Sequence, residues 1–349
     1  MAPISSARNR RAVPDLQTVD EIFGIGGLIH VRRGSKGTRA RPDRIDRSLP
    51  DELAYPTTEP VRAANGVGLI RVSAWSSLPW LWHGFSTRLG GVSHAYSPEG
   101  APGELNLGFT AADERAAVIS NRRLLAEAAT GSPKTPLIAL RQCHSKVITT
   151  AIAERDTPAR GDGLITAEAG LLLAIQTADC IPVLVADRKQ RVVAAFHAGW
   201  RGTVQRIVES GIGTMRVEFN CRPQDLTAAI GPGIGPCCYA VGEEVLSGFE
   251  SQFAYARDLF HEVFDTDSVR TKYPMLFLTQ RAPGHSPIGP NLHVDLIDAN
   301  RRQLLEAGVR PKAIQVVGGC TSCRRDLFFS HRASHGHTGR MMSVIGIRG

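Results

Sequence analysis

Three residues of the types that hold transition metals stand far apart in the sequence, at His144, Cys180 and His197. One thiolate and two imidazoles suit Zn²⁺ and leave a fourth position for water or substrate, as catalytic zinc sites require. The separations of 36 and 17 residues match no compact zinc finger, so three different strand ends must meet to build the site. The competing interpretation is that each is an ordinary buried polar residue.

A second candidate is the segment 85–93, FSTRLGGVS, in which Arg88 stands beside two glycines. Its guanidinium and the hydroxyl of Thr87 are groups that hold a phosphate or a ribose. A plain glycine-rich hairpin explains the same residues.

Other cysteines and histidines carry weaker signals. Cys320 and Cys323 form a C-x-x-C, which is either half of a structural zinc site, a redox pair or two packed thiols, and no second C-x-x-C occurs. His331, His335 and His337 form a local cluster that either binds a metal or lies in an exposed loop.

Several enzyme classes lack their motifs here. The sequence contains no G-x-S-x-G, no Walker A loop and no H-E-x-x-H. The glycine-rich segment 231–236 has proline where a dinucleotide-binding fingerprint needs its last glycine. These observations disfavour serine hydrolases of that type, P-loop enzymes, zincins and a Rossmann site.

The elements that must position these residues alternate between short apolar strands and helices. This pattern predicts one α/β or α+β domain. The expected strands are 171–175, 182–185, 192–196, 228–230 and 341–347, and the expected helices are 203–210 with Thr203 as N-cap, one from about 242, and 296–307 ended by Gly308.

Length and composition fit a globular chain of 349 residues, with 42% hydrophobic and 21% charged residues. Seven scattered cysteines form no disulfide framework, which indicates reduced thiols. The longest apolar runs are too short to span a bilayer, and no signal peptide follows Met1. We therefore expect a cytoplasmic monomer or homodimer without a membrane partner.

The net charge of +8 is partly concentrated in residues 30–47, within an unpatterned segment. No aromatic residue stands there to stack a base, so a solvated tail is favoured over a specific nucleic-acid module. We divide the chain into a basic extension, 1–62, and a catalytic domain, 63–349.

Taken together, several motifs resemble those of the YfiH family in their order along the chain. They are Gln142-x-His144, Thr177-Ala-Asp-Cys180, His197-Ala-Gly-Trp-Arg-Gly202, Ile230-Gly-Pro-Gly-Ile-Gly-Pro-Cys-Cys-Tyr239, Asp295-Leu-x-x-Ala-Asn300, Cys320-Thr-x-Cys323 and Thr338-Gly-Arg340. That family was first called multicopper polyphenol oxidoreductase or laccase-domain proteins and was later assigned purine nucleoside phosphorylase activity. The resemblance covers about 66–349.

The resemblance implies a single-domain layered α-β-β-α sandwich, with zinc held by His144, Cys180 and His197. It also implies phosphorolysis of adenosine, inosine, guanosine and methylthioadenosine to base and ribose 1-phosphate, and deamination of adenosine to inosine. The partners are then purine nucleosides and phosphate.

For such an enzyme we assign further roles to nearby side chains. Asp179 is the candidate general acid or base, or it orients His197. Arg201 and Arg88 are the candidate phosphate clamps, and Asn106 and Asp162 are weaker candidates for contacts with the substrate hydroxyls or base.

Three alternatives stay open. Copper is an alternative occupant that would give polyphenol oxidation, although the single H-x-H at 335–337 does not supply the ligands of a multicopper oxidase. Cys180 with His197 as base would act as the nucleophile of an amidase. A closed zinc site, with Cys143 or Cys323 as fourth ligand, would be structural in a metal- or partner-binding protein.

Overall fold

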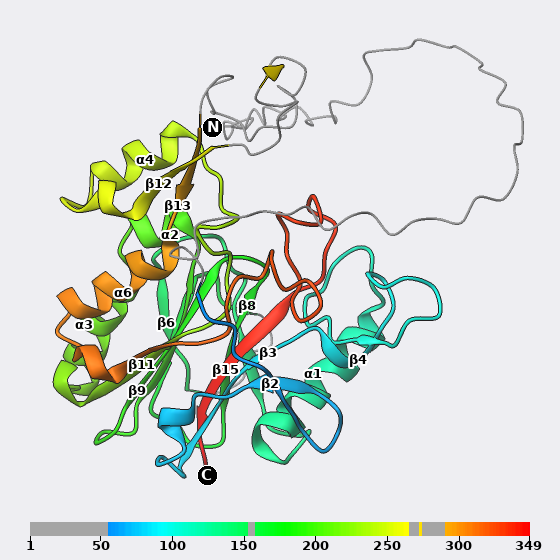
Figure 1. Cartoon of the computed structure of the whole chain (residues 1–349). Coiled ribbons are helices and arrows are strands. Elements are labelled where there is room, and N and C mark those ends of the chain that lie inside the picture. The colour runs from blue at the N-terminus through cyan, green and yellow to red at the C-terminus, as the bar shows by residue number, and fades with distance from the viewer. Residues whose placement is uncertain (1–54, 153–157, 265–271, 274–289) are drawn as a thin grey trace, which may run out of the picture. The chain divides into compact units, whose positions relative to one another are not determined.

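Two six-stranded sheets stacked face to face form the centre of the computed structural model, and helices cover both outer faces (Figure 1). The structure describes residues 55–152, 158–264, 272–273 and 290–349, which all belong to one compact unit. The predicted layered α-β-β-α arrangement in a single domain is confirmed.

The first sheet has the C-terminal strand near its centre. Its order is β1 (Val61–Arg62), β2 (Gly68–Ile70), β3 (Leu81–Ser86), β15 (Met341–Ile347), β8 (Leu172–Thr177) and β5 (Leu137–Ala139). All neighbours are antiparallel except β5 and β8, which are parallel. β4 (Leu89–Ser93) follows β3.

The second sheet has an antiparallel centre and parallel edges. Its order is β14 (Ile314–Val316), β11 (Leu226–Ile230), β9 (Ile181–Asp187), β10 (Val193–Ala198), β7 (Gly163–Thr166) and β6 (Ile148–Thr150). The two edge strands, β14 and β6, run parallel to their neighbours. A separate two-stranded sheet pairs β12 (Phe260–Val263) with β13 (Asn291–Val294).

The central strands are unbroken apolar runs because one face of each is covered by the other sheet and the other face by helices. In β10, Val193 and Ala195 pack between the sheets, whereas Ala194 and Phe196 pack against helices. β15 divides in the same way, with Ile345 in the core between the sheets and Val344 in the core under a helix.

The helices divide unequally between the two faces. α2 (Trp200–Val204), α3 (Ile207–Phe219), α4 (Glu243–Glu250) and α6 (Leu296–Glu306) pack against the second sheet, and α1 (Arg115–Thr130) packs against the first. Short 3₁₀ helices span Ser73–Trp75, Pro223–Asp225, Ala256–Leu259 and Pro311–Ala313. None of the helices in the described part of the chain has the length and apolar character needed to cross a membrane.

The expected helix over 203–210 is wrong in its start and its continuity. α2 begins at Trp200, and Thr203 lies inside it instead of at an N-cap. The chain then breaks at Arg206, whose φ of 59° is left-handed, before α3 begins. The i, i+3 spacing of apolar residues continues through this break, because Val204 and Ile207 both pack into the same core.

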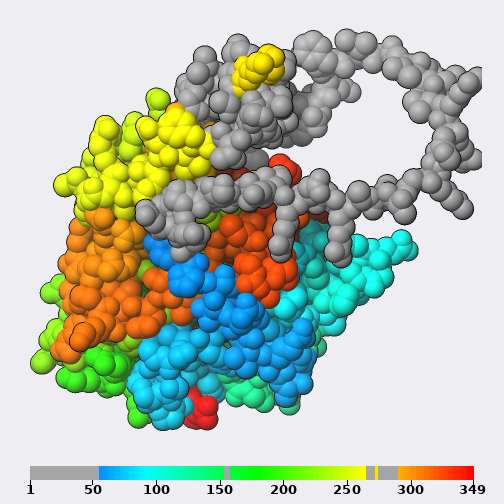
Figure 2. All heavy atoms as spheres, viewed as in Figure 1, coloured from blue at the N-terminus to red at the C-terminus, as the bar shows by residue number. Residues whose placement is uncertain are grey.

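The domain takes in residues that we had placed in the extension. β1 pairs with β2, the Tyr55 hydroxyl donates to Asp295 at 2.7 Å, and the Thr58 amide donates to the carbonyl of Gly318 at 3.0 Å. Figure 2 shows these blue residues against orange segments of the C-terminal half. Residues 1–54 of the expected extension lie outside the described residues.

Two glycines of α3 predict opposite effects of the same substitution. A β-carbon at Gly211 would lie 2.2 Å from the ring of Phe196, whereas one at Gly213 would have no neighbour within 4 Å. We expect Gly213→Ala to raise the free energy of unfolding by up to about 1 kcal/mol through helix propensity. We expect Gly211→Ala to lower it by about 1–3 kcal/mol through overpacking.

Urea denaturation of both variants measures these changes. A stabilised Gly211→Ala variant would show that Phe196 does not restrict the approach of α3 to β10.

Candidate metal centre

His144, Cys180 and His197 meet in one cluster, in which all three ligand atoms lie within 4.8 Å of one another. Cys180 Sγ is 3.7 Å from His144 Nε2, and the two imidazole rings are 4.9 Å apart, edge to face. His197 is buried, Cys180 is partly buried and His144 is exposed, so the cluster is open to solvent on one side.

Backbone turns bring the three residues together. β9 starts directly after Cys180, and its register pairs Ala198 with Ile181, which places Cys180 beside the end of β10, where His197 lies. His144 lies in the loop between β5 and β6 with a left-handed φ of 58°. Gly199 is required here, because a β-carbon would lie 2.9 Å from both Cys180 Sγ and His144 Cδ2.

The carboxylate of Asp162, fully buried beneath the cluster, fixes two of these residues. Its Oδ1 accepts a hydrogen bond from His197 Nδ1 at 2.8 Å and one from the His144 amide at 3.0 Å. Its Oδ2 accepts from both the amide and the hydroxyl of Ser145 at 2.7 Å, and the Cys143 amide is 3.2 Å from each oxygen. A carboxylate that holds Nδ1–H leaves Nε2 of the imidazole available as a metal ligand.

The electrostatics favour a thiolate. Burial opposes ionisation of Cys180, but the charge of His197 and hydrogen bonds from both histidines outweigh it and lower the pKa of Cys180 to about 6. Burial also opposes the charged form of His197, yet Cys180 and Asp162 raise the pKa of His197 to about 9. Hydrogen bonds from His197 and Ser145 outweigh the burial of Asp162 and hold its pKa below the usual range.

This donor set fits a transition metal. A thiolate and two imidazoles within 4.8 Å of one another are the ligands that borderline-soft cations such as Zn²⁺ prefer. With three ligands and an exposed side, the arrangement matches metal centres that keep a position for substrate.

The chain as a whole is similar to known proteins. The profile of the family described as multi-copper polyphenol oxidoreductase laccase matches residues 82–348. The chain belongs to this family. The match includes the whole second sheet, the first sheet from β3 onward and all three cluster residues, whereas β1 and β2 precede it.

Relatives within the family carry phosphorylase names. The chain is 36% identical to the purine nucleoside phosphorylase YlmD of Geobacillus stearothermophilus over 277 residues, 76% of this chain and 89% of the relative. It is 39% identical to a purine nucleoside phosphorylase of Deinococcus radiodurans over 265 residues, 76% of this chain and 88% of the relative. These names indicate an enzyme family.

Solved structures of family members share the fold. The crystal structure of YlmD from Geobacillus stearothermophilus superposes with a TM-score of 0.66 at 33% identity, covering 83% of this chain and 99% of that one. That of the hypothetical protein YfiH from Bacillus licheniformis gives 0.65 at 31% identity, with 82% and 97% covered.

The structure corrects one role within the family motif Thr177–Cys180. Asp179 does not orient His197, because Asp162 does. Both Asp179 oxygens are occupied, Oδ1 by the hydroxyl of Thr321 and Oδ2 by the amide of Arg332, each at 2.7 Å. Asp179 therefore holds the C-terminal loop against the turn that carries Cys180.

The two candidate phosphate clamps differ in their availability. Arg201 is exposed, stacks on Trp200 at 4.2 Å and has no carboxylate partner among the described residues. Arg88 pairs with Glu104, donates to the carbonyl of Arg325 and stacks on a phenylalanine, so its guanidinium is already committed.

Three of the expected substrate contacts are buried instead. Thr87 donates to the Gly68 carbonyl, and Asn106 fixes the backbone at Gly108 and Arg340. Both side chains are fully buried, as is Asp162. Their polar atoms are paired within the protein, so these side chains hold the local backbone and do not face a substrate.

Tyr239 and Arg332 are neighbours of the centre that sequence reasoning assigned no role. The Arg332 guanidinium stacks on the Tyr239 ring at 5.2 Å and donates to the Ala240 carbonyl. Burial and the negative charge of Cys180 raise the pKa of Tyr239, so its hydroxyl stays protonated. The only sequence signal was the place of Tyr239 at the end of a family motif.

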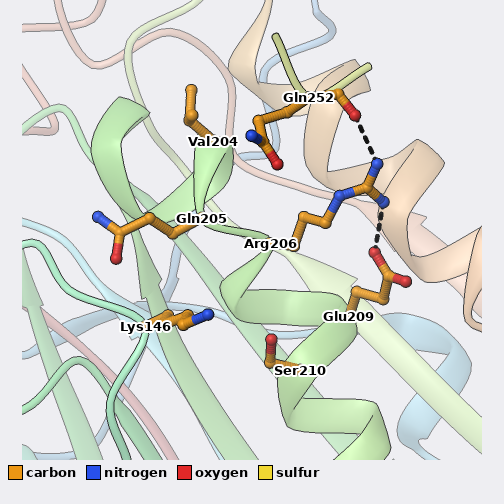
Figure 3. Close-up of a pocket in the computed structure, with 7 residues that line it drawn as sticks. All are labelled: Lys146, Val204, Gln205, Arg206, Glu209, Ser210 and Gln252. Atoms are coloured by element: carbon orange, nitrogen blue, oxygen red, sulfur yellow. Dashed lines mark hydrogen bonds and ion pairs between the residues drawn. The ribbon is translucent and has the colours of Figure 1, made fainter. Parts of the chain in front are cut away.

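A pocket of about 460 Å³ lies at the junction of α2 and α3 (Figure 3). Two cations line it, Lys146 and Arg206, and Arg206 is held by the Glu209 carboxylate at 2.7 Å and by the Gln252 carbonyl. Its seven lining residues include no member of the cluster, so we do not assign the substrate to it.

Asp162→Asn tests the positioning carboxylate. The amide nitrogen of asparagine would face backbone N–H donors, so we expect Zn²⁺ affinity at the centre to fall about 10- to 100-fold. Chelator competition measures this affinity.

Asp187→Asn is the matched control, because Asp187 is another fully buried carboxylate that accepts two backbone hydrogen bonds, at the opposite end of β9. We expect Asp187→Asn to lower the free energy of unfolding and to leave the Zn²⁺ affinity of the centre unchanged. Equal affinity in Asp162→Asn and the unchanged protein would contradict the role of Asp162.

Proposed function

We propose that this chain is a zinc-dependent purine nucleoside phosphorylase. The observation that carries the proposal is the cluster of His144, Cys180 and His197, open on one side and fixed from beneath by Asp162. The names of relatives that match 76% of the chain support the substrate class, which is purine nucleosides and phosphate. We include adenosine, inosine, guanosine and methylthioadenosine among the nucleosides.

His144, Cys180 and His197 would hold the Zn²⁺ ion, with the cysteine as thiolate. When bound, the ion supplies Lewis acidity at the open side of the cluster. The chain keeps the ligands in place without it: Asp162 fixes the His197 ring, and the amides of 143–145 fix the loop of His144.

Phosphorolysis requires an anion to be placed against the sugar. A phosphate oxygen forms a bond to C1′ of the ribose, the bond from C1′ to the purine nitrogen breaks, and the base leaves with that electron pair. The transition state places positive charge on the ribose and keeps negative charge on phosphate, so a cation beside the phosphate binds and orients it. Of the two candidate clamps, Arg201 is the one available for this, because Arg88 is paired with Glu104.

We include adenosine deamination as a slower second activity. Zinc-dependent deaminases pair cysteine and histidine ligands with a separate carboxylate that moves protons. Here the two carboxylates beside the ligands, Asp162 and Asp179, have both oxygens occupied by hydrogen bonds. A proton must therefore pass through another group, which slows the step.

One observation favours a second candidate function, an amidase with Cys180 as nucleophile. Cys180, His197 and Asp162 form a chain of thiol, imidazole and carboxylate with an acidic thiol, as in cysteine hydrolases. Cys180 and His197 are also proposed metal ligands, and Asp162 positions His197. The two functions therefore differ in whether activity survives removal of the metal.

We do not propose copper-dependent oxidation for this chain, although the family description names it. The described residues offer two metal clusters, one with two histidines and one with none. A blue multicopper oxidase needs many more imidazoles for its coppers.

Incubation of zinc-loaded protein with adenosine or inosine, each with and without phosphate, tests the function. We expect phosphate-dependent release of adenine and hypoxanthine, and slower formation of inosine from adenosine without phosphate. Chromatography separates these products.

Cys180→Ala should abolish both activities, and Cys221→Ala, at a buried thiol outside both clusters, should keep them. No turnover by protein with a filled centre would sink the proposal. Hydrolysis of amides after chelation would support the amidase.

Arg201→Ala tests the phosphate clamp. Loss of a charge-assisted hydrogen bond worth about 1.5–3 kcal/mol should raise KM for phosphate roughly 10- to 100-fold. Arg216→Ala removes another exposed arginine, from the last turn of α3, and should leave KM unchanged. If both variants have the same KM for phosphate, Arg201 does not bind it.

A further inference from the structure

A second cluster of ligand atoms lies apart from the centre described above. The sulfurs of Cys237, Cys238, Cys320 and Cys323 all lie within 4.8 Å of one another. Cys323 Sγ is 3.5 Å from Cys237 Sγ and 3.4 Å from Cys238 Sγ. Three of the four cysteines are buried, and Cys323 is exposed at the rim. The C-x-x-C at 320–323 thus has a partner, which is the adjacent pair 237–238.

Strand topology explains why the two pairs meet. β11 and β14 are parallel neighbours with Ile230 opposite Val316. Because the carboxyl ends of parallel neighbours lie at the same edge of a sheet, the loops that follow both strands leave side by side. Gly233 and Cys320 form a bridge between these loops, and the Thr321 amide donates to the Gly233 carbonyl at 2.9 Å.

The sulfur positions fit one tetrahedrally bound ion. Zn–S bonds of about 2.3 Å place the sulfurs of a tetrahedral site about 3.8 Å apart, close to the 3.4 and 3.5 Å observed. A disulfide needs about 2.05 Å, much shorter than either separation.

The backbone around the sulfurs also suits thiolates. The Gly235 amide donates to Cys320 Sγ at 3.3 Å, which is the kind of outer contact that steadies a metal-bound thiolate. A β-carbon at Gly235 would lie 3.2 Å from Cys237 Sγ and 3.3 Å from the Cys320 β-carbon, so the absence of a side chain lets the loop close over the sulfurs.

We propose that Cys237, Cys238, Cys320 and Cys323 bind a second metal ion, a structural Zn²⁺ with four thiolate ligands. Four zinc–sulfur bonds form, and the protons of the thiols pass to solvent. Because four protein ligands close the coordination sphere, this ion activates no substrate.

The second ion would brace the first centre without sharing a residue with it. The Asp179 carboxylate accepts from Thr321, between the two cysteines of the C-x-x-C, and its carbonyl accepts from the Ile234 amide. Asp179 stands next to Cys180, so a cross-link between the two loops fixes the turn that carries this ligand. The proposal is independent of the reaction that the first centre performs.

Metal analysis of protein purified under reducing conditions with zinc tests the proposal. We expect two zinc ions per chain in the unchanged protein, one in Cys180→Ala, one in the double variant Cys320→Ser/Cys323→Ser, and none in the combined triple variant. Cys221→Ser is the control and should retain two.

Cobalt substitution gives a test that needs no buried substitution. Co²⁺ bound to thiolates absorbs through sulfur-to-metal charge transfer. The Cys180→Ala protein has no thiol in the first cluster, so its absorption should come from the four-cysteine site. Replacing the exposed Cys323 as well, in Cys180→Ala/Cys323→Ser, should remove at least half of this absorption. The double cysteine variant should also unfold at a lower temperature.

Three results would overturn the proposal. One is a single zinc per chain that disappears in Cys180→Ala. Another is two zinc ions retained in the double cysteine variant. The third is mass spectrometry showing a disulfide among the four cysteines of protein kept under reducing conditions, which would make them a redox pair.

Discussion

The buried carboxylate of Asp162 is the group on which the candidate metal centre depends. It receives hydrogen bonds from three consecutive backbone amides, one hydroxyl and one imidazole, which join the loop of His144 to the strand of His197. An ionised carboxylate so deeply buried is stable only because all of these donors are aimed at it. The same charge raises the pKa of His197, and the charge of His197 in turn favours the thiolate of Cys180. A metal ion bound at Nε2 of His197 would displace the proton held there. One anion thus organises both the positions and the protonation states of the ligands.

The sheet behind this centre supplies its rigidity. His197 ends a strand with neighbours on both sides, and the register of β10 with β7 places Asp162 directly opposite it. Cys180 precedes β9, which is buried on both faces. Ligands at the ends of such strands lose little conformational entropy when they bind, because folding has already ordered them. The open side is formed by the loop of the exposed His144, and Arg201 is exposed in the first turn of α2, which follows β10.

Residue type and motif order predicted part of this picture well. The apolar runs of β8, β9, β10 and β15 were evident because strands covered on both faces need no polar alternation. The cluster of His144, Cys180 and His197 was predicted from the chemistry of the three side chains and from the family resemblance. The hydrogen bond from His197 to Asp162 was not predicted, since it depends on strand register, which spacing along the chain does not encode. The break at Arg206 was missed because the apolar pattern is the same on both sides of it.

Cys237 and Cys238 were not matched with Cys320 and Cys323, because only the parallel pairing of β11 and β14 brings them together.

The position of β15 has a consequence for the order in which the molecule assembles. This strand, Met341–Ile347, lies between β3 and β8 and contacts both along most of its length. During synthesis on a ribosome, β3 and β8 are complete long before β15, which separates them, so the first sheet has an empty place at its centre until β15 emerges. Until then, the edges of β3 and β8 that pair with β15 are unpaired and open to pairing with another chain.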